Sequence, residues 1–246
     1  MKILLVTLLL VLTSSASSSP TKFVYNISQN QIVVDCDSET VRPIASVTKL
    51  MTALVVLDSQ QSMTERLNYK GYSKRNLTRE EIFNLMLVKS DNRAAETLAK
   101  NYLGGRDQFI KEMNMKALSL GMTHTRYEDP SGISSKNIST ARDLTRLLVH
   151  MHTYERVIDV TSQASYSMDV ESKKKKHTMV TINNTNRNLL SEFGGIEISK
   201  TGTTNAAGKC LAMFVTRNGL HYVVVILGER NRKTIEKVSR NILVTL

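Results

Sequence analysis

Both ends of the chain carry the apolar pattern of β-strands. In Lys22–Asp37, β-branched and aromatic residues lie on either side of a short polar stretch, which predicts a hairpin. Three further strands are expected near the other end, at residues 197–202, 209–217 and 220–228. Asn218-Gly219 separates the last two and is a pair typical of two-residue hairpin turns. We expect the two ends to build one sheet, with residues 232–246 packing on it as an amphipathic helix.

The middle of the chain changes to helical patterns. Residues 44–57 are apolar nearly all round, as in a helix at the centre of a protein, and we expect it to begin at Ala45 or Ser46. A capping box at 78–81 opens the next helix. Helical spacing and terminal glycines predict three more helices, at residues 93–102, 106–120 and 140–152. Together these segments predict a helical lobe over about residues 60–155.

The first 20 residues have the composition of a secretory signal peptide: one lysine, an apolar run, and then small residues. The apolar run, Ile3–Leu12, is about half of the roughly 20 residues needed to span a bilayer, so no stable membrane anchor is expected. We therefore divide the chain into a signal peptide, residues 1–19, and one catalytic domain, residues 20–246. The expected location is periplasmic or secreted.

The chain is strongly basic, with a formal net charge of +11. Export argues against nucleic acid as the partner, and an aromatic content of 5% leaves few platforms for stacking bases. The charge fits an acidic cell-envelope polymer or a solvated surface. Its densest part, Lys173–Lys176, is expected to be an exposed loop.

Neither the histidines nor the cysteines indicate a metal site. His150 and His152 are two residues apart on an expected helix, so their side chains point in different directions. Cys36 and Cys210 fall on expected strands; export permits a disulfide between them, but we expect both to be unpaired. No metal or other cofactor is expected.

Ser46 and Lys49 are three residues apart at the start of the expected central helix, so their side chains lie on one face. Burying an ammonium group is costly unless it is paired or its pKa falls, and a lowered pKa would let Lys49 act as a general base toward Ser46. The helix N-terminus would add a free N–H group, which is half of an oxyanion hole. By itself the pair is weak evidence, because a lysine that reaches solvent is the commoner arrangement.

Two further motifs follow in order, Ser90-Asp91-Asn92 between two expected helices and Lys200-Thr201-Gly202 on an expected strand. This triplet of motifs occurs in penicillin-binding proteins and class A β-lactamases. Five segments carry a wider resemblance: RPIASVTKLMTAL, KSDNRAAETLA, DPSG followed by STARDL, NNTNRNLL, and KTGTTNAAGKCLAM. Over roughly Phe23 to Gly228 the chain resembles the low-molecular-mass penicillin-binding proteins, the D-alanyl-D-alanine carboxypeptidases and endopeptidases.

The resemblance implies an α+β fold of the β-lactamase/DD-peptidase type, with a five-stranded antiparallel sheet, flanking helices and a helical lobe. It also implies roles for the motif residues. Ser46 would attack the D-Ala carbonyl and form an acyl-enzyme, and Lys49 would take its proton. Ser90 would relay a proton to the leaving amine, and Asn92 would bind Lys49 and the substrate backbone.

The strand motif would hold the substrate. By the same resemblance, Lys200 would keep the site electropositive and Thr201 would offer its hydroxyl to the substrate carboxylate. Gly202 would let the substrate approach the sheet edge, and the N–H group of Thr203 would complete the oxyanion hole with that of Ser46. Structural roles are expected for Asp129-Pro130-Ser131-Gly132 and Asp143, and Arg230 is a further guess for a carboxylate contact.

The implied partners are peptidoglycan stem peptides and cross-links, with β-lactams as covalent inhibitors, and the protein is expected to be a monomer. Two alternatives stay open. A class A-like β-lactamase needs a glutamate with an asparagine four residues on, whereas Gly132 stands four residues after Glu128. A catalytically inactive peptidoglycan-binding protein is disfavoured because the five catalytic candidates are all present. Between endopeptidase and carboxypeptidase we favour endopeptidase, because the chain ends soon after the expected sheet.

Overall fold

The structure is a computed structural model that describes residues 19–71, 76–171 and 177–246. The expected signal peptide, apart from its last residue, and the basic run Lys173–Lys176 lie outside the described residues. No helix in the described ranges has the length and apolar character needed to cross a membrane. Nor do these ranges contain a group of three or more His, Cys, Asp or Glu side chains that could hold a metal ion.

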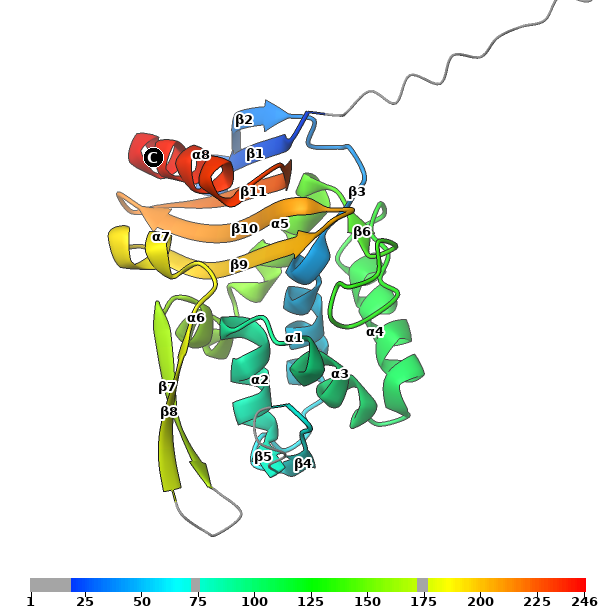
Figure 1. Ribbon diagram of the computed structural model, residues 1–246. Coiled ribbons are helices and arrows are strands. Elements are labelled where there is room, and N and C mark those ends of the chain that lie inside the picture. The colour runs from blue at the N-terminus through cyan, green and yellow to red at the C-terminus, as the bar shows by residue number, and fades with distance from the viewer. Residues whose placement is uncertain (1–18, 72–75, 172–176) are drawn as a thin grey trace, which may run out of the picture.

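A five-stranded antiparallel sheet combines strands from the N-terminal and the C-terminal parts of the described chain, which confirms the predicted architecture (Figure 1). Its order is β2-β1-β11-β10-β9. The strands are β1 (Thr21–Asn26), β2 (Gln31–Cys36), β9 (Ile196–Thr204), β10 (Gly208–Arg217) and β11 (Leu220–Glu229). β1 pairs with β11, so the N-terminal hairpin joins the C-terminal strands directly. β9, which carries the Lys200-Thr201-Gly202 motif, is therefore an edge strand.

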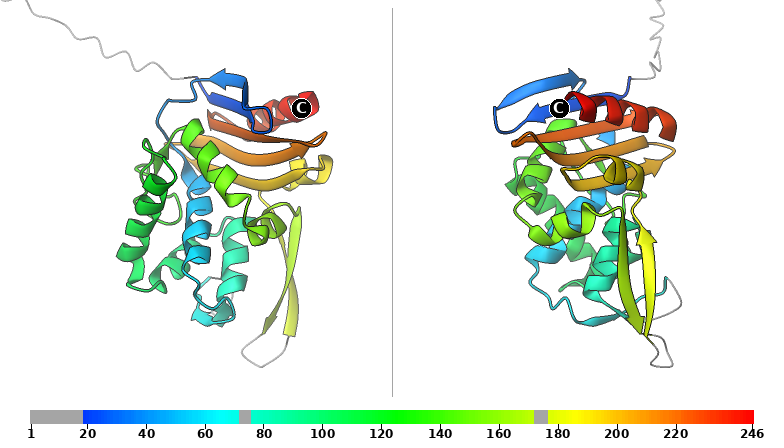
Figure 2. Two further views of the ribbon diagram at one scale, coloured as in Figure 1. Left: turned by 180° about the vertical axis from the view of Figure 1, so that it is seen from behind. Right: turned by 90° about the vertical axis from the view of Figure 1, so that its left-hand side faces the viewer.

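Alternation along the strands gives the sheet two apolar faces. On β11, Val223 and Val225 belong to the larger core, on the side of the helical lobe, whereas Val224 and Ile226 belong to a second cluster. The helix α8 (Arg232–Thr245) contributes Ile235 to this second cluster, as its amphipathic pattern predicts. Two views turned from the first show α8 on one face of the sheet and the helical lobe on the other (Figure 2).

The helical lobe surrounds a central helix that is buried from Lys49 to Val56. Its members are α1 (Lys49–Asp58), α2 (Arg79–Val88), α3 (Asn92–Lys100), α4 (Gly105–Ser119), α5 (Ala141–Met151) and α6 (Glu155–Thr161). The predicted capping box is present, because the Thr78 hydroxyl accepts a hydrogen bond from the N–H of Glu81 while the Glu81 side chain accepts one from the N–H of Thr78. Thr140 and Asp91 cap α5 and α3 with their side chains, which accept hydrogen bonds from the N–H groups of Asp143 and Ala94.

The start of the central helix differs from the prediction. Residues Ala45–Thr48 form a 3-10 turn, η1, and the α-helix begins only at Lys49. Ala45 has a φ of 46°, in the left-handed region, so the chain enters the turn sharply and regular helix cannot extend back through it. Ser46 thus lies in the 3-10 turn.

Smaller elements complete the described chain, and several were not predicted. A two-stranded hairpin, β7 (Ser165–Glu171) with β8 (His177–Asn183), projects beside α2 and α6 (Figure 1). The short elements are β3 (Arg42–Pro43) with β6 (Ile138–Ser139), β4 (Arg66–Asn68) with β5 (Asn76–Thr78), and α7 (Arg187–Glu192). The two cysteines lie on strands as predicted, Cys36 exposed on β2 and Cys210 buried on β10, and both are free thiols.

Candidate active site

The amine of Lys49 is the centre of the site. Its Nζ lies 2.8 Å from Ser46 Oγ, 2.7 Å from Asn92 Oδ1 and 2.5 Å from the carbonyl oxygen of Ser131. A neutral amine has two N–H groups and one lone pair. Its two N–H groups can donate to Asn92 Oδ1 and to the Ser131 carbonyl oxygen, since both oxygens can only accept. Its lone pair can then accept the proton of the Ser46 hydroxyl. The three contacts fit a neutral lysine that accepts the Ser46 proton, and they fit equally an ammonium group that donates to all three oxygens.

Burial favours this uncharged form. Lys49 is fully buried, and desolvation lowers the pKa of its amine from 10.5 to about 7, against the opposing charges of Asp129 and Asp91. An amine with a pKa near 7 is available in its basic form at neutral pH.

The 3-10 turn explains how Ser46 and Lys49 meet. Side chains at i and i+3 eclipse one another in a 3-10 helix, because it has three residues per turn. Ser46 lies in this turn and Lys49 directly follows it. The tight turn thus brings the Ser46 hydroxyl next to the Lys49 amine. Ser46 remains partly exposed, whereas Lys49 is buried.

The second motif joins the third through Ser90. This residue links α2 to α3 and has a φ of 61°, which turns the chain sharply between the two helices. Its hydroxyl oxygen accepts a hydrogen bond of 2.8 Å from Lys200 Nζ. Lys200 also donates to the carbonyl oxygen of Thr201, at 3.0 Å. Burial holds the pKa of the Lys200 amine well below its usual value, and Lys49, whenever it is protonated, lowers this pKa further.

Three hydrogen bonds therefore join the five catalytic candidates into two groups. Lys49 bridges Ser46 and Asn92, and Lys200 holds Ser90, two residues before Asn92. These residues come from the 3-10 turn, the α2–α3 connection and β9, which are far apart in the sequence. Asp91, the middle residue of the second motif, instead caps α3 through Ala94 and accepts a hydrogen bond of 2.9 Å from the hydroxyl of Tyr69.

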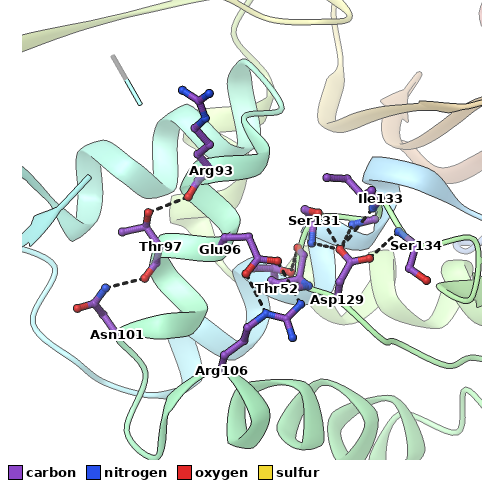
Figure 3. A network of polar contacts seen from close by, with 12 residues as sticks. Thr52, Arg93, Glu96, Thr97, Asn101, Arg106, Asp129, Ser131, Ile133 and Ser134 are labelled. Atoms are coloured by element: carbon purple, nitrogen blue, oxygen red, sulfur yellow. Dashed lines mark hydrogen bonds and ion pairs between the residues drawn. The ribbon is translucent and has the colours of Figure 1, made fainter. Parts of the chain in front are cut away.

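Asp129 organises the loop that supplies the third partner of Lys49. Its Oδ1 accepts hydrogen bonds of 2.7 Å from the N–H groups of Ser131 and Gly132, and its Oδ2 accepts one of 2.7 Å from the N–H of Ser134 (Figure 3). Burial raises the pKa of Asp129, but these hydrogen bonds outweigh it and hold the pKa below its usual value of 3.8. The carboxylate thereby fixes the loop with the Ser131 carbonyl directed at Lys49.

The same loop packs tightly on the turn that carries Ser46. Gly132 has a φ of +83°, and a Cβ atom added to it would lie 1.9 Å from the carbonyl oxygen of Ala45. Asn137 ties the two segments together, because its side-chain amide donates to Thr48 Oγ1 and to the carbonyl oxygen of Asp129. Asp143 lies further away and accepts hydrogen bonds from His124 and Thr125.

The edge of β9 forms the opposite wall. A Cβ atom added to Gly202 would lie 3.0 Å from the backbone nitrogen of Ser46, so only a glycine permits this approach without a shift. Thr201 donates its hydroxyl proton to Thr185 Oγ1, at 2.6 Å. Thr201, Gly202, Thr203 and Thr185 also line a cavity of about 220 Å³ beside the edge. This cavity is also lined by Leu211 and Ile235 of the second apolar cluster and by none of the five catalytic candidates, so it is the close approach of Gly202 that places the strand next to the turn carrying Ser46.

Two groups in this site were absent from the sequence-based candidates. The Ser131 carbonyl lies in the Asp129-Pro130-Ser131-Gly132 motif, but its contact with Lys49 uses a backbone oxygen that every residue possesses. Thr185 lies in the segment NNTNRNLL, which likewise carried no role. Arg230, the guessed carboxylate contact, is exposed, and Arg232 rather than Arg230 lines the cavity beside Thr201.

Comparison with known proteins places the chain among cell-wall peptidases. A family model described as D-alanyl-D-alanine carboxypeptidase matches residues 13–231. The D-alanyl-D-alanine endopeptidase of Escherichia coli K12 is 36% identical over 85% of this chain and 71% of its own length. That of Pseudomonas aeruginosa is 39% identical, with the same coverage of both chains.

Solved structures agree with this placement. A variant of the Streptomyces K15 DD-transpeptidase matches with a TM-score of 0.84 and 25% identity, over 90% of this chain and 95% of the other. Penicillin-binding protein D2 of Listeria monocytogenes in its ampicillin-bound form matches with a TM-score of 0.79 and 28% identity. That match covers 92% of this chain and 95% of the Listeria protein.

Proposed function

The chain belongs to the D-alanyl-D-alanine carboxypeptidase family and is a serine DD-peptidase of peptidoglycan, and from this premise we propose that Ser46 is its nucleophile and stem-peptide cross-links are its preferred substrate. The observation that carries the assignment of Ser46 is its contact with Lys49. A buried amine with a lowered pKa, 2.8 Å from an accessible hydroxyl, is the arrangement that activates a serine.

Acylation begins with proton transfer from Ser46 Oγ to Lys49 Nζ. Asn92 and Ser131 accept the two N–H groups of the neutral amine and so aim its lone pair at the hydroxyl. The oxygen of Ser46 then attacks the D-Ala carbonyl carbon. The backbone N–H groups of Ser46 and Thr203 stabilise the oxyanion, a role supported by the close approach of β9 to the 3-10 turn at Gly202.

The leaving amine needs a proton, and Ser90 is the residue that we assign to this relay. Its hydroxyl accepts from Lys200 and can donate its own proton to the departing nitrogen. The lowered pKa of Lys200 helps it to share its proton with Ser90. Water then hydrolyses the acyl-enzyme: one of its protons replaces the proton that Ser90 and Lys200 gave to the leaving amine, and Lys49 returns its proton to the Ser46 oxygen.

β9 provides the binding wall. As the edge strand of the sheet, it can pair with an extended substrate backbone through its free side. Thr201 offers its hydroxyl to a substrate carboxylate, and Gly202 leaves space for the chain that passes next to Ser46.

A preference for cross-links over terminal D-Ala-D-Ala is supported by the relatives, because the proteins from Escherichia coli, Pseudomonas aeruginosa and Haemophilus influenzae are all named endopeptidases. The purified protein should be incubated with cross-linked muropeptide dimers and, separately, with monomeric pentapeptides. Release of monomers from the dimers at a rate well above loss of D-Ala from the pentapeptide is expected. The opposite ratio would assign the chain as a carboxypeptidase.

β-Lactams should acylate Ser46, since similar solved structures hold ampicillin and cefotaxime. Labelling with a fluorescent penicillin is expected for the natural chain and should disappear in Ser46→Ala. Ser59→Ala, at the end of α1, is the matched control and should label normally. Absence of label from the folded natural chain would instead favour an inactive peptidoglycan-binding protein. A periplasmic or secreted monomer is the state in which we expect it to act.

A further inference from the structure

Thr185 contacts both walls of the site. Its backbone N–H donates to the carbonyl oxygen of Val88 at 3.1 Å, and Val88 is the last residue of α2, two positions before Ser90. Its side-chain oxygen accepts the hydroxyl proton of Thr201 at 2.6 Å. One residue therefore connects the segment that carries Ser90 with the strand that carries Thr201.

Buried amides hold Thr185 in place independently of its hydroxyl. The Asn184 side chain donates to the carbonyl oxygen of Gln163 at 3.1 Å, and its Oδ1 accepts from the N–H of Asn186 at 2.9 Å. The Asn186 side chain donates to Ser199 Oγ on β9 at 2.7 Å. Because both asparagines are buried and bonded, removing the Thr185 hydroxyl should leave the backbone of this turn where it is.

The Thr185–Thr201 hydroxyl pair can rearrange, because the bond between the two hydroxyls leaves acceptor positions unused on both oxygens. Each hydroxyl can donate one proton and accept two. With no substrate, Thr201 donates to Thr185. When a carboxylate binds beside Thr201, Thr201 can redirect its proton to the anion, and Thr185 can rotate its own hydroxyl to donate into the freed Thr201 oxygen. A donor behind Thr201 polarises its O–H bond and strengthens the bond to the anion.

We propose that Thr185 is a positioning residue that acts through Thr201 to make the site selective for substrates with a carboxylate at this position. The inference rests on the proposed function, in which Thr201 binds that carboxylate. It assigns to Thr185 a role in binding the substrate and none in the proton transfers at Ser46.

Thr185→Val tests the hydroxyl alone, because valine has nearly the same shape and keeps the backbone N–H that bonds to Val88. The probes are an N-acylated peptide that ends in D-Ala-D-Ala and the same peptide with a C-terminal amide. With the acid, the valine variant should lose about tenfold in kcat/KM, mostly through KM, as expected for one hydrogen bond to an anion. With the peptide amide, kcat/KM of the valine variant should stay within about twofold of the natural chain. Thr185→Ser, which keeps a hydroxyl, should have a kcat/KM for the peptide acid near the natural value.

A double-mutant cycle shows whether Thr185 acts through Thr201. The double variant Thr185→Val with Thr201→Val should have the same kcat/KM for the peptide acid as Thr201→Val alone. Thr181→Val is the matched control, because it removes a hydroxyl that bonds Ser167 on the same hairpin, away from the site. It should change neither substrate's kinetics.

Equal losses on the acid and the amide, or additive losses in the double variant, would overturn the inference. If the valine variant does not fold, Thr185→Ala must show the same loss of kcat/KM with the peptide acid and no such loss with the peptide amide. A natural chain that neither binds penicillin covalently nor cleaves either peptide would refute the proposed function itself. An active natural chain with an unselective Thr185→Val would refute only the role of Thr185.

Discussion

The side-chain nitrogen of Lys49 lies 2.8 Å from the side-chain oxygen of Ser46, and both groups stem from one tight turn at the base of a buried helix. The contact is local in sequence, so it needs little of the tertiary fold to form. Its chemical character, however, comes from the tertiary fold, because burial under the Asp129 loop and beside Asn92 lowers the pKa of the amine.

This lowered pKa predicts the pH dependence of acylation. Protonated Lys49 has no lone pair, so the second-order rate of reaction with benzylpenicillin should fall about tenfold per pH unit below 7 and level off above it. Lys49→Arg should be slower by at least about a thousandfold throughout, since a guanidinium stays protonated. A natural-chain rate that does not change between pH 5 and 8 would contradict the assignment of Lys49 as the base.

Asp129 should make the stability of the protein depend on pH in acid. Its pKa is lower in the folded protein than the usual 3.8, so its stabilising contribution is complete above pH 4 and is lost as the pH falls through the folded-state value. Asp129→Asn should reduce the free energy of unfolding by about 2 to 4 kcal/mol at pH 7, because buried N–H groups lose a charged acceptor. The difference from the natural chain should shrink toward pH 3 in urea titrations.

Asp169→Asn is the control for this series. Asp169 is exposed and pairs with His177 on the β7–β8 hairpin, so its removal should cost less than about 1 kcal/mol. A similar loss in both variants, or a loss for Asp129→Asn that does not change with pH, would show that the loop is not held by the ionised carboxylate.

Gly132→Ala should displace Ser46. The new Cβ would lie 1.9 Å from the Ala45 carbonyl oxygen, which is a backbone atom and cannot move without moving the 3-10 turn. We expect acylation by benzylpenicillin to slow by at least about a hundredfold, since small displacements of a nucleophile have effects of that order. Gly219→Ala shares the positive φ but has no atom within 4 Å, so it should cost only about 1 kcal/mol of stability and leave acylation unchanged.

The sequence predicted the features that depend on local patterns. The hairpin around Asn218-Gly219, the capping box at Thr78 and the meeting of Ser46 with Lys49 all follow from spacing within a few residues, and the structure contains each of them. The five-stranded sheet was expected from the family resemblance, because pairing of β1 with β11 joins segments too distant for any local pattern to predict.

Three features were not predicted, and the reasons differ. The β7–β8 hairpin was missed although Tyr166 and Met168 alternate with polar residues along β7, because β8 is mostly polar and exposed and a basic run separates the two segments. The 3-10 start of the central helix depends on the left-handed φ of Ala45, which apolar residues rarely adopt. The contact between Lys49 and Ser131 spans 82 residues and uses a backbone carbonyl, so no side-chain pattern marks it.

Glu128 is the remaining residue whose role the structure makes testable. In a class A-like β-lactamase a glutamate near this position would activate the water that deacylates the enzyme. Here its carboxylate instead accepts hydrogen bonds from Ser134 Oγ at 2.7 Å and from Lys136 Nζ at 3.2 Å. Both hydrogen bonds hold the Glu128 carboxylate to its own loop and lower its pKa, and neither joins it to Ser46 or Lys49.

We therefore expect the benzylpenicillin adduct to persist in the natural chain and in Glu128→Gln alike. Mass spectrometry of the intact protein after removal of free drug should show deacylation rates that agree within about twofold, because the substitution removes only a surface ion pair. Asp143→Asn, which affects a buried carboxylate away from Lys49, controls for general loosening of the fold. Turnover of penicillin at tens per second by the natural chain, abolished in Glu128→Gln, would instead establish a β-lactamase.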